Sequence, residues 1–148
     1  MNKLALAFGT LAILATPAVA AEDPVMVRKI LMQGNAAGAG LAGAMLKGEM
    51  EYSPAAGKAA IASMNAASHA FGDYFPKGSA EGDTTAAPAI WEDAAGWEAE
   101  LAKFTSATSA AAEASGREGP ADLDTFKAAV GPVLGTCKSC HEGYRVKR

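Results

Sequence analysis

The 148-residue chain has little of what marks a β-sheet protein, a nucleic-acid-binding protein or an enzyme. It contains two cysteines and two histidines, its β-branched residues are sparse, and no run alternates between apolar and polar residues. The formal net charge is −3, and no cluster of basic residues stands out, which argues against a nucleic-acid partner. No pair of residues suggests general acid–base catalysis, so we do not expect an enzyme.

Long apolar runs are also missing, except at the N-terminus. Lys3 precedes an apolar stretch over residues 4–14, and Ala18-Val19-Ala20 matches the A-x-A pattern of a signal-peptide cleavage site. The stretch is too short to span a bilayer comfortably. We therefore predict a cleaved signal peptide over residues 1–20, a single mature domain over residues 21–148, export of the chain and no stable insertion into a membrane. The alternative is an uncleaved signal anchor.

The remainder is rich in alanine, which favours helices. Clusters of proline and glycine divide it into four predicted helical segments, about Pro24–Leu46, Pro54–Phe75, Ala89–Ser115 and Ala121–Tyr144. Each segment has an apolar stripe, and Asp23, Ser53 and Asp122 are candidate N-caps. The predicted fold is therefore all-α, an antiparallel four-helix bundle with one core.

Some positions within these segments carry more specific predictions. Gly34, Gly38, Gly40 and Gly43 favour a close approach of the first helix to a flat cofactor or to another helix. Pro132 is expected to kink or restart the last helix. The acidic residues of the third segment, Glu92, Asp93, Glu98 and Glu100, are interpreted as a solvated helix face.

The most specific motif is Cys137-Lys138-Ser139-Cys140-His141, which has the C-x-x-C-H spacing of a c-type haem attachment site. On a helix, Cys137, Cys140 and His141 share one face, so two thiols can form thioethers with the haem vinyl groups while the histidine reaches the iron. A thioredoxin-type disulfide is one alternative, but no strand-like run precedes the motif. Half of a zinc site is another, although the only other histidine, His69, is distant in sequence.

These residues resemble the class II c-type cytochromes, which comprise cytochrome c′ and its low-spin relative cytochrome c-556. The resemblance covers nearly the whole mature chain and rests on five features: the motif near the C-terminus, Tyr144-Arg145 after it, Arg28-Lys29-Ile30-Leu31-Met32, Lys47-Gly48-Glu49, and Ala89-Ile90-Trp91. It implies a four-helix bundle with one haem c, a periplasmic location, redox protein partners and, in many members, a homodimer packed through the first helix.

The resemblance also implies roles for individual residues. His141 is the proximal iron ligand, Arg28 lies beside the haem propionates, and Arg145 matches the arginine on the proximal side. Met32 matches the distal position, where a methionine ligates iron in the c-556 type. Met26, Met45, Met50 and Met64 are secondary candidates, and His69 is a remote one.

We therefore predict a one-electron carrier whose iron is held by His141 and Met32. The first alternative is a five-coordinate cytochrome c′ that binds nitric oxide or carbon monoxide, with Met32 only shielding the iron. The second is a helical protein without haem, which would make the motif accidental.

Overall fold

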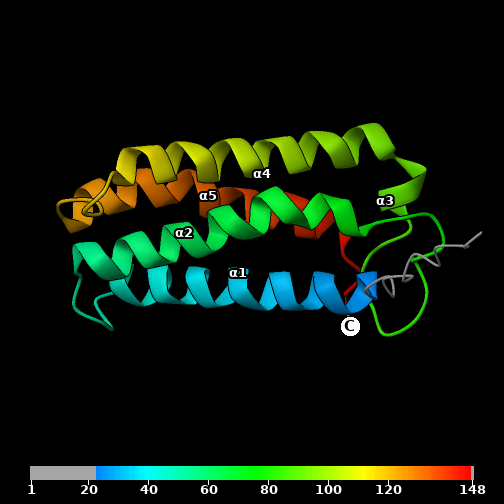
Figure 1. Ribbon diagram of the computed structural model, residues 1–148, viewed down its shortest axis with the longest axis horizontal. Helices are drawn as coiled ribbons and strands as arrows, with labels where there is room; N and C mark the ends of the chain where they lie inside the picture. Colours follow the sequence, from blue (N-terminus) through cyan, green and yellow to red (C-terminus); the bar gives the residue numbers. More distant parts are fainter. Residues whose placement is uncertain (1–22, 148) are drawn as a thin grey trace, which may run out of the picture.

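The computed structural model describes residues 23–147, so the predicted signal peptide lies outside the described residues (Figure 1). Four long helices make up the described part: α1 (Pro24–Leu46), α2 (Pro54–Phe71), α4 (Ala94–Ser115) and α5 (Leu123–Tyr144). A short 3-10 helix, η1 (Gly72–Tyr74), and the one-turn helix α3 (Ala89–Glu92) lie between α2 and α4. The all-α four-helix bundle is confirmed. Within residues 23–147, no helix is both long and apolar enough to cross a membrane.

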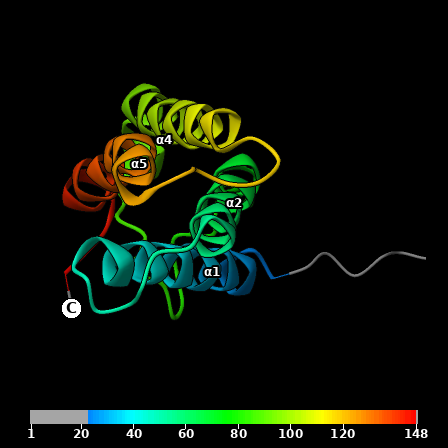
Figure 2. The ribbon, with the colours of Figure 1, turned by 90° about the vertical axis from the view of Figure 1, so that its left-hand side faces the viewer.

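Successive long helices run in opposite directions, and this brings distant parts of the sequence together (Figure 1). The start of α1, the end of α2, the start of α4 and the end of α5 all lie at one end of the bundle, where the C-terminus is marked. Helix α1 packs on α2, α2 packs on α4, and α4 packs on α5, as the end-on view in Figure 2 shows. The motif at the end of α5 therefore shares one end of the bundle with the first turns of α1.

The predicted caps are confirmed where the three helices α1, α2 and α5 begin. Carboxylate or hydroxyl oxygens of Asp23, Ser53 and Asp122 accept hydrogen bonds from backbone N–H groups two or three residues later, at 2.9, 3.3 and 2.7 Å. Each bond satisfies an N–H group that the helix itself leaves unpaired. The starts of these helices were therefore predictable from the caps.

Three predicted segments differ from the structure. Helix α5 begins at Leu123, two residues after the predicted start at Ala121. Helix α2 ends at Phe71, and η1 continues only to Tyr74, so the predicted end at Phe75 is slightly late. The predicted helix Ala89–Ser115 is interrupted at Asp93, whose φ of −120° and ψ of 64° are not helical. Asp93 is instead the N-cap of α4, since its Oδ1 accepts from Gly96 N at 3.1 Å.

Pro132 neither ends nor restarts the last helix, because α5 is continuous from Leu123 to Tyr144. Pro132 has no N–H group, so the carbonyl group of Ala128 lacks its usual helical hydrogen bond. Both residues are on the exposed side of the helix. Water can therefore solvate that carbonyl, which lowers the cost of a proline inside a helix.

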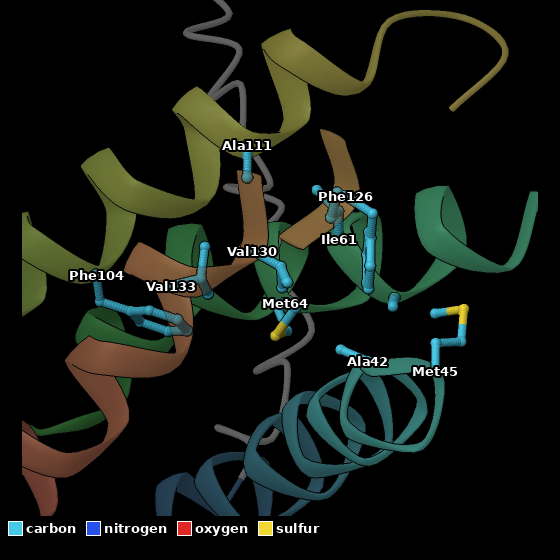
Figure 3. Close-up of a cluster of buried hydrophobic side chains, with 10 residues drawn as sticks. Ala42, Met45, Ile61, Met64, Phe104, Ala111, Phe126, Val130 and Val133 are labelled. Carbon is cyan, nitrogen blue, oxygen red and sulfur yellow. The ribbon is translucent and has the colours of Figure 1, made fainter. Parts of the chain in front are cut away.

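The apolar core fills the middle of the bundle with side chains from all four long helices (Figure 3). Phe126, Val130 and Val133 of α5 point toward Ile61 and Met64 of α2. Of the four glycines in α1, Gly38 is the one at which an added Cβ would clash with another helix, 2.9 Å from the Ala60 carbonyl oxygen of α2. Gly34 also contacts α2, because its carbonyl oxygen accepts from Ser63 Oγ at 2.8 Å. The predicted close approach is therefore a contact between α1 and α2 at these two glycines.

Candidate haem-binding site

A cavity of about 560 Å³ opens at the end of the bundle where α5 ends and α1 begins. Its volume falls within the range of cofactor pockets, roughly 300–1,000 Å³. The walls come from all four long helices and from the loop before α3, and they are mainly apolar. The charged, sulfur-containing, aromatic and hydrogen-bonding side chains of the lining include Arg28, Met32, Asn35, Phe71, Phe75, Trp97, Glu100, Cys137, Cys140, His141, Tyr144 and Arg145.

The motif residues line this cavity together, as their spacing on one helix predicts. Cys137 and Cys140 are half-buried free thiols. Burial raises the pKa of Cys137, and burial with the charges of Glu100 and Cys137 raises the pKa of Cys140 to about 11. Both thiols are therefore protonated at neutral pH.

His141 stands at the exposed rim of the same cavity. Desolvation by its surroundings lowers the pKa of His141, and the positive charge of Arg145 lowers it further. The imidazole is therefore neutral at physiological pH, which is the form that binds a metal ion.

Two residues of α1, Met32 and Asn35, face the cavity from another wall. Met32 is half-buried, and Asn35 is only 8% exposed. Asn35 Nδ2 donates to Met32 Sδ at 3.9 Å, while Asn35 Oδ1 has no partner among the described residues. Buried polar atoms in proteins are nearly always paired, so Asn35 Oδ1 is an unsatisfied acceptor in this wall.

The other methionines of the described part and His69 do not line the cavity. Met45 and Met64 are buried in the core, and Met26 is exposed. His69 is exposed on α2, with its Nε2 3.2 Å from Ser109 Oγ. Of the candidate distal residues, only Met32 is brought to the motif.

Arg28 is buried at the cavity wall, where it fastens the loop that follows η1. Its Nη1 donates to Tyr74 O at 3.2 Å and to Ser79 Oγ at 3.0 Å, and its Nη2 donates to Ser79 O at 2.9 Å. The guanidinium also lies 4.6 Å from the centre of the Phe75 ring. Burial lowers the pKa of Arg28, an effect that Asp23 partly opposes, but an arginine stays charged under these conditions.

Arg145 lines the cavity at the end of α5 and holds the other side of the same loop. Its backbone forms an isolated antiparallel bridge with Ala86, flanked by Val146 N donating to Thr85 O at 2.9 Å. Arg28 and Arg145 are thus both brought to the cavity, and each also positions the loop.

An aromatic wall encloses the cavity, and the sequence indicated only part of it. The ring centres of Phe75 and Trp97 are 4.8 Å apart, and those of Trp97 and Tyr144 are 5.4 Å apart. Phe71 packs edge-on against Phe75 at 4.9 Å. These rings lie on the apolar stripes of three predicted helical segments, but only the three-dimensional arrangement shows that the stripes end at the motif.

One acidic residue, Glu100, was wrongly assigned to a solvated face. Asp93 is exposed as expected, although it caps α4 and accepts from Tyr144 OH at 2.8 Å. The Glu100 side chain is only 13% exposed, lines the cavity, and accepts from Ser139 Oγ at 2.7 Å. The sequence did contain a signal, because Glu100 lies three residues after Trp97 and so shares its face.

The residues present fit a covalently attached haem. Two protonated thiols and a neutral imidazole come from one helix, a thioether comes from another, and the walls between them are aromatic. The thiols can hold the group, the imidazole and thioether can ligate iron, and the rings can exclude water from it.

Comparisons with known proteins agree with this geometry. The family model described as cytochrome C′ matches residues 23–145. A cytochrome c′ from Cereibacter sphaeroides is 39% identical over 90% of this chain and 90% of its own length, and a cytochrome c-556 from Agrobacterium fabrum is 34% identical over 91% and 89%. The solved structure of a ferrous cytochrome c′ variant from Alcaligenes xylosoxidans with bound NO aligns with a TM-score of 0.74, at 30% identity, and covers 86% of this chain and 96% of that chain. The chain belongs to the cytochrome c′ family, the small c-type cytochromes with a single covalently attached haem c.

Proposed function

We propose that the protein is a periplasmic one-electron carrier in which His141 and Met32 would ligate the haem iron. The observation that carries this proposal is the position of Met32. Among the described residues, it is the only methionine that lines the cavity of the motif. Iron held by both a thioether and an imidazole would favour reversible electron transfer over the binding of an external ligand.

When bound, the haem supplies a one-electron couple between ferric and ferrous iron. Cys137 and Cys140 hold it through two thioethers, and His141 presents a neutral nitrogen. Asn35 donates to the sulfur of Met32 and limits its orientation. Arg28 and Arg145 supply positive charge for the propionates, and the aromatic wall keeps water out.

The alternative is a five-coordinate iron that binds nitric oxide or carbon monoxide on the face next to Met32. Two observations favour it over other candidates. Variants of the Alcaligenes xylosoxidans relative have been solved with NO bound and with carbon monoxide bound. In this chain, the Asn35 amide is a polar group beside the same position.

The proposal also includes a periplasmic location, redox protein partners and a homodimer. The signal peptide over residues 1–20 directs the chain to the periplasm, the mature domain covers residues 21–148, and redox proteins are its partners. Self-association as a homodimer through α1 is supported by two exposed apolar residues one turn apart, Met26 and Ile30, which are 59% and 57% exposed.

Visible spectroscopy of two methionine variants tests the axial ligand. Met32→Ala should convert a low-spin spectrum into a high-spin one that responds to carbon monoxide, because the sixth ligand is gone. Met26→Ala is the matched control, since it removes an exposed methionine of the same helix and should leave the spectrum unchanged. A Met32→Ala protein that keeps the wild-type spectrum would rule out this ligand.

Covalent attachment is tested separately by haem staining after denaturation. The wild-type chain should stain, and a variant with both Cys137→Ala and Cys140→Ala should not. An unstained wild-type chain from a host with a working c-type maturation system would favour the helical protein without haem.

A further inference from the structure

Glu100 is the only carboxylate among the described residues that line the cavity. The other charged side chains there are the cations Arg28, Lys29 and Arg145, besides the titratable motif residues. Glu100 stands in the second turn of α4, and its side chain is 13% exposed, so water screens it much less than it screens an ordinary surface glutamate. A poorly screened charge in a cofactor cavity acts on whatever the cavity holds.

Two hydrogen bonds fix where this charge lies. Ser139 Oγ donates to Glu100 Oε2 at 2.7 Å, and Ser139 belongs to the attachment motif itself. Lys103 Nζ donates to Glu100 Oε1 at 2.5 Å. The hydrogen bond from Lys103, followed by that from Ser139, lowers the pKa of Glu100, so the carboxylate is ionised at neutral pH.

Lys103 offsets this negative charge only in part. Its side chain is 62% exposed, against 13% for Glu100, so solvent and salt screen the ammonium group more strongly than the carboxylate. The electrostatic potential that Glu100 and Lys103 together produce in the cavity is therefore negative. Glu98 and Glu92, on the exposed side of the same region, are not part of the cavity wall.

We propose that Glu100 tunes the reduction potential of the haem: its carboxylate, anchored to the motif by Ser139, stabilises the more positive ferric state and so lowers the potential. The proposal rests on the haem of the proposed function but not on the identity of the sixth ligand. A fixed charge shifts the potential of a five-coordinate and of a six-coordinate iron in the same direction.

The test is the midpoint potential of purified holoprotein variants at pH 7 and low salt. Glu100→Gln should raise the potential by an amount equal to at least a twofold change in the reduction equilibrium, about 18 mV at 59 mV per tenfold change for one electron. Glu98→Gln is the matched control, because it removes the same charge from an exposed position of the same helix, and it should shift the potential by less than half as much. Lys103→Gln should lower the potential, because the carboxylate loses its counter-charge.

A shift for Glu100→Gln more than twice that for Glu98→Gln, with the opposite sign for Lys103→Gln, would support the proposal. Equal shifts for Glu100→Gln and Glu98→Gln would overturn it, since net charge alone would then explain the effect. If the Glu100→Gln protein fails to load haem, the midpoint potential of Lys103→Gln is the test. An unchanged or raised potential in that variant would overturn the proposal. The visible spectra of the same samples report the axial ligands, so a high-spin wild type would refute Met32 ligation without affecting the result for Glu100.

Discussion

Replacing Arg28 with methionine should loosen the loop over the cavity and destabilise the whole domain. Arg28 is 4% exposed, and its two shortest hydrogen bonds, at 2.9 and 3.0 Å, both go to Ser79. Hydrogen bonds from a charged group contribute about 1.5–3 kcal/mol each, and a carbonyl left buried without its donor adds to the loss. Methionine retains some of the packing on Phe75, so we expect a loss of about 3 kcal/mol in the free energy of unfolding.

Equilibrium urea unfolding of the holoprotein, followed by circular dichroism, measures this loss. Lys29→Met is the matched control, because it removes the neighbouring positive charge, whose ion pair with Asp83 is exposed. An exposed ion pair contributes no more than about 1 kcal/mol. If Arg28→Met cost no more than Lys29→Met, the loop would not depend on the buried guanidinium, and our reasoning would be wrong.

Three further predictions concern the packing and the caps. Phe126→Ala, at a fully buried core position, should cost about 3–5 kcal/mol in urea unfolding, and a loss below about 1 kcal/mol would contradict the core described above. Gly38→Ala should cost about 1–3 kcal/mol, because the new methyl group meets the Ala60 carbonyl oxygen, and an unchanged stability would show that α1 can move away. Asp122→Ala should lower the melting temperature at pH 7. Hydrogen bonds from Thr125 lower the Asp122 pKa below its ordinary 3.8, so the wild-type advantage should be full above that value and shrink as the pH falls through the folded pKa. A gap in melting temperature that stays constant from pH 7 to pH 2 would contradict this role.

The sequence predicted the caps of α1, α2 and α5, because capping depends on residues close together in the chain, but it missed the equally local cap that Asp93 forms at α4. It was less accurate where a distant contact decides the outcome. Asp93 interrupts the predicted third helix, and the partner that holds its side chain, Tyr144, comes from the end of α5. Pro132 was expected to kink or restart α5, and the helix does not restart there, because the exposed position makes the unpaired carbonyl tolerable.

The residues of the site also divide into those that the sequence predicts and those whose roles depend on distant contacts. Cys137, Cys140 and His141 follow from spacing on one helix, and Met32 and Arg28 followed from the family resemblance rather than from periodicity. The role of Glu100 was missed because its partner, Ser139, is 39 residues away on the next long helix. The anchoring of a loop by Arg28 was missed for the same reason.

The visible spectrum of the wild-type holoprotein, oxidised and reduced, with and without carbon monoxide, tests the central claim most directly. Ligation by both His141 and Met32 predicts a low-spin spectrum in each oxidation state that carbon monoxide does not change. A high-spin spectrum that shifts when carbon monoxide is added would contradict this claim and would favour the gas-binding alternative.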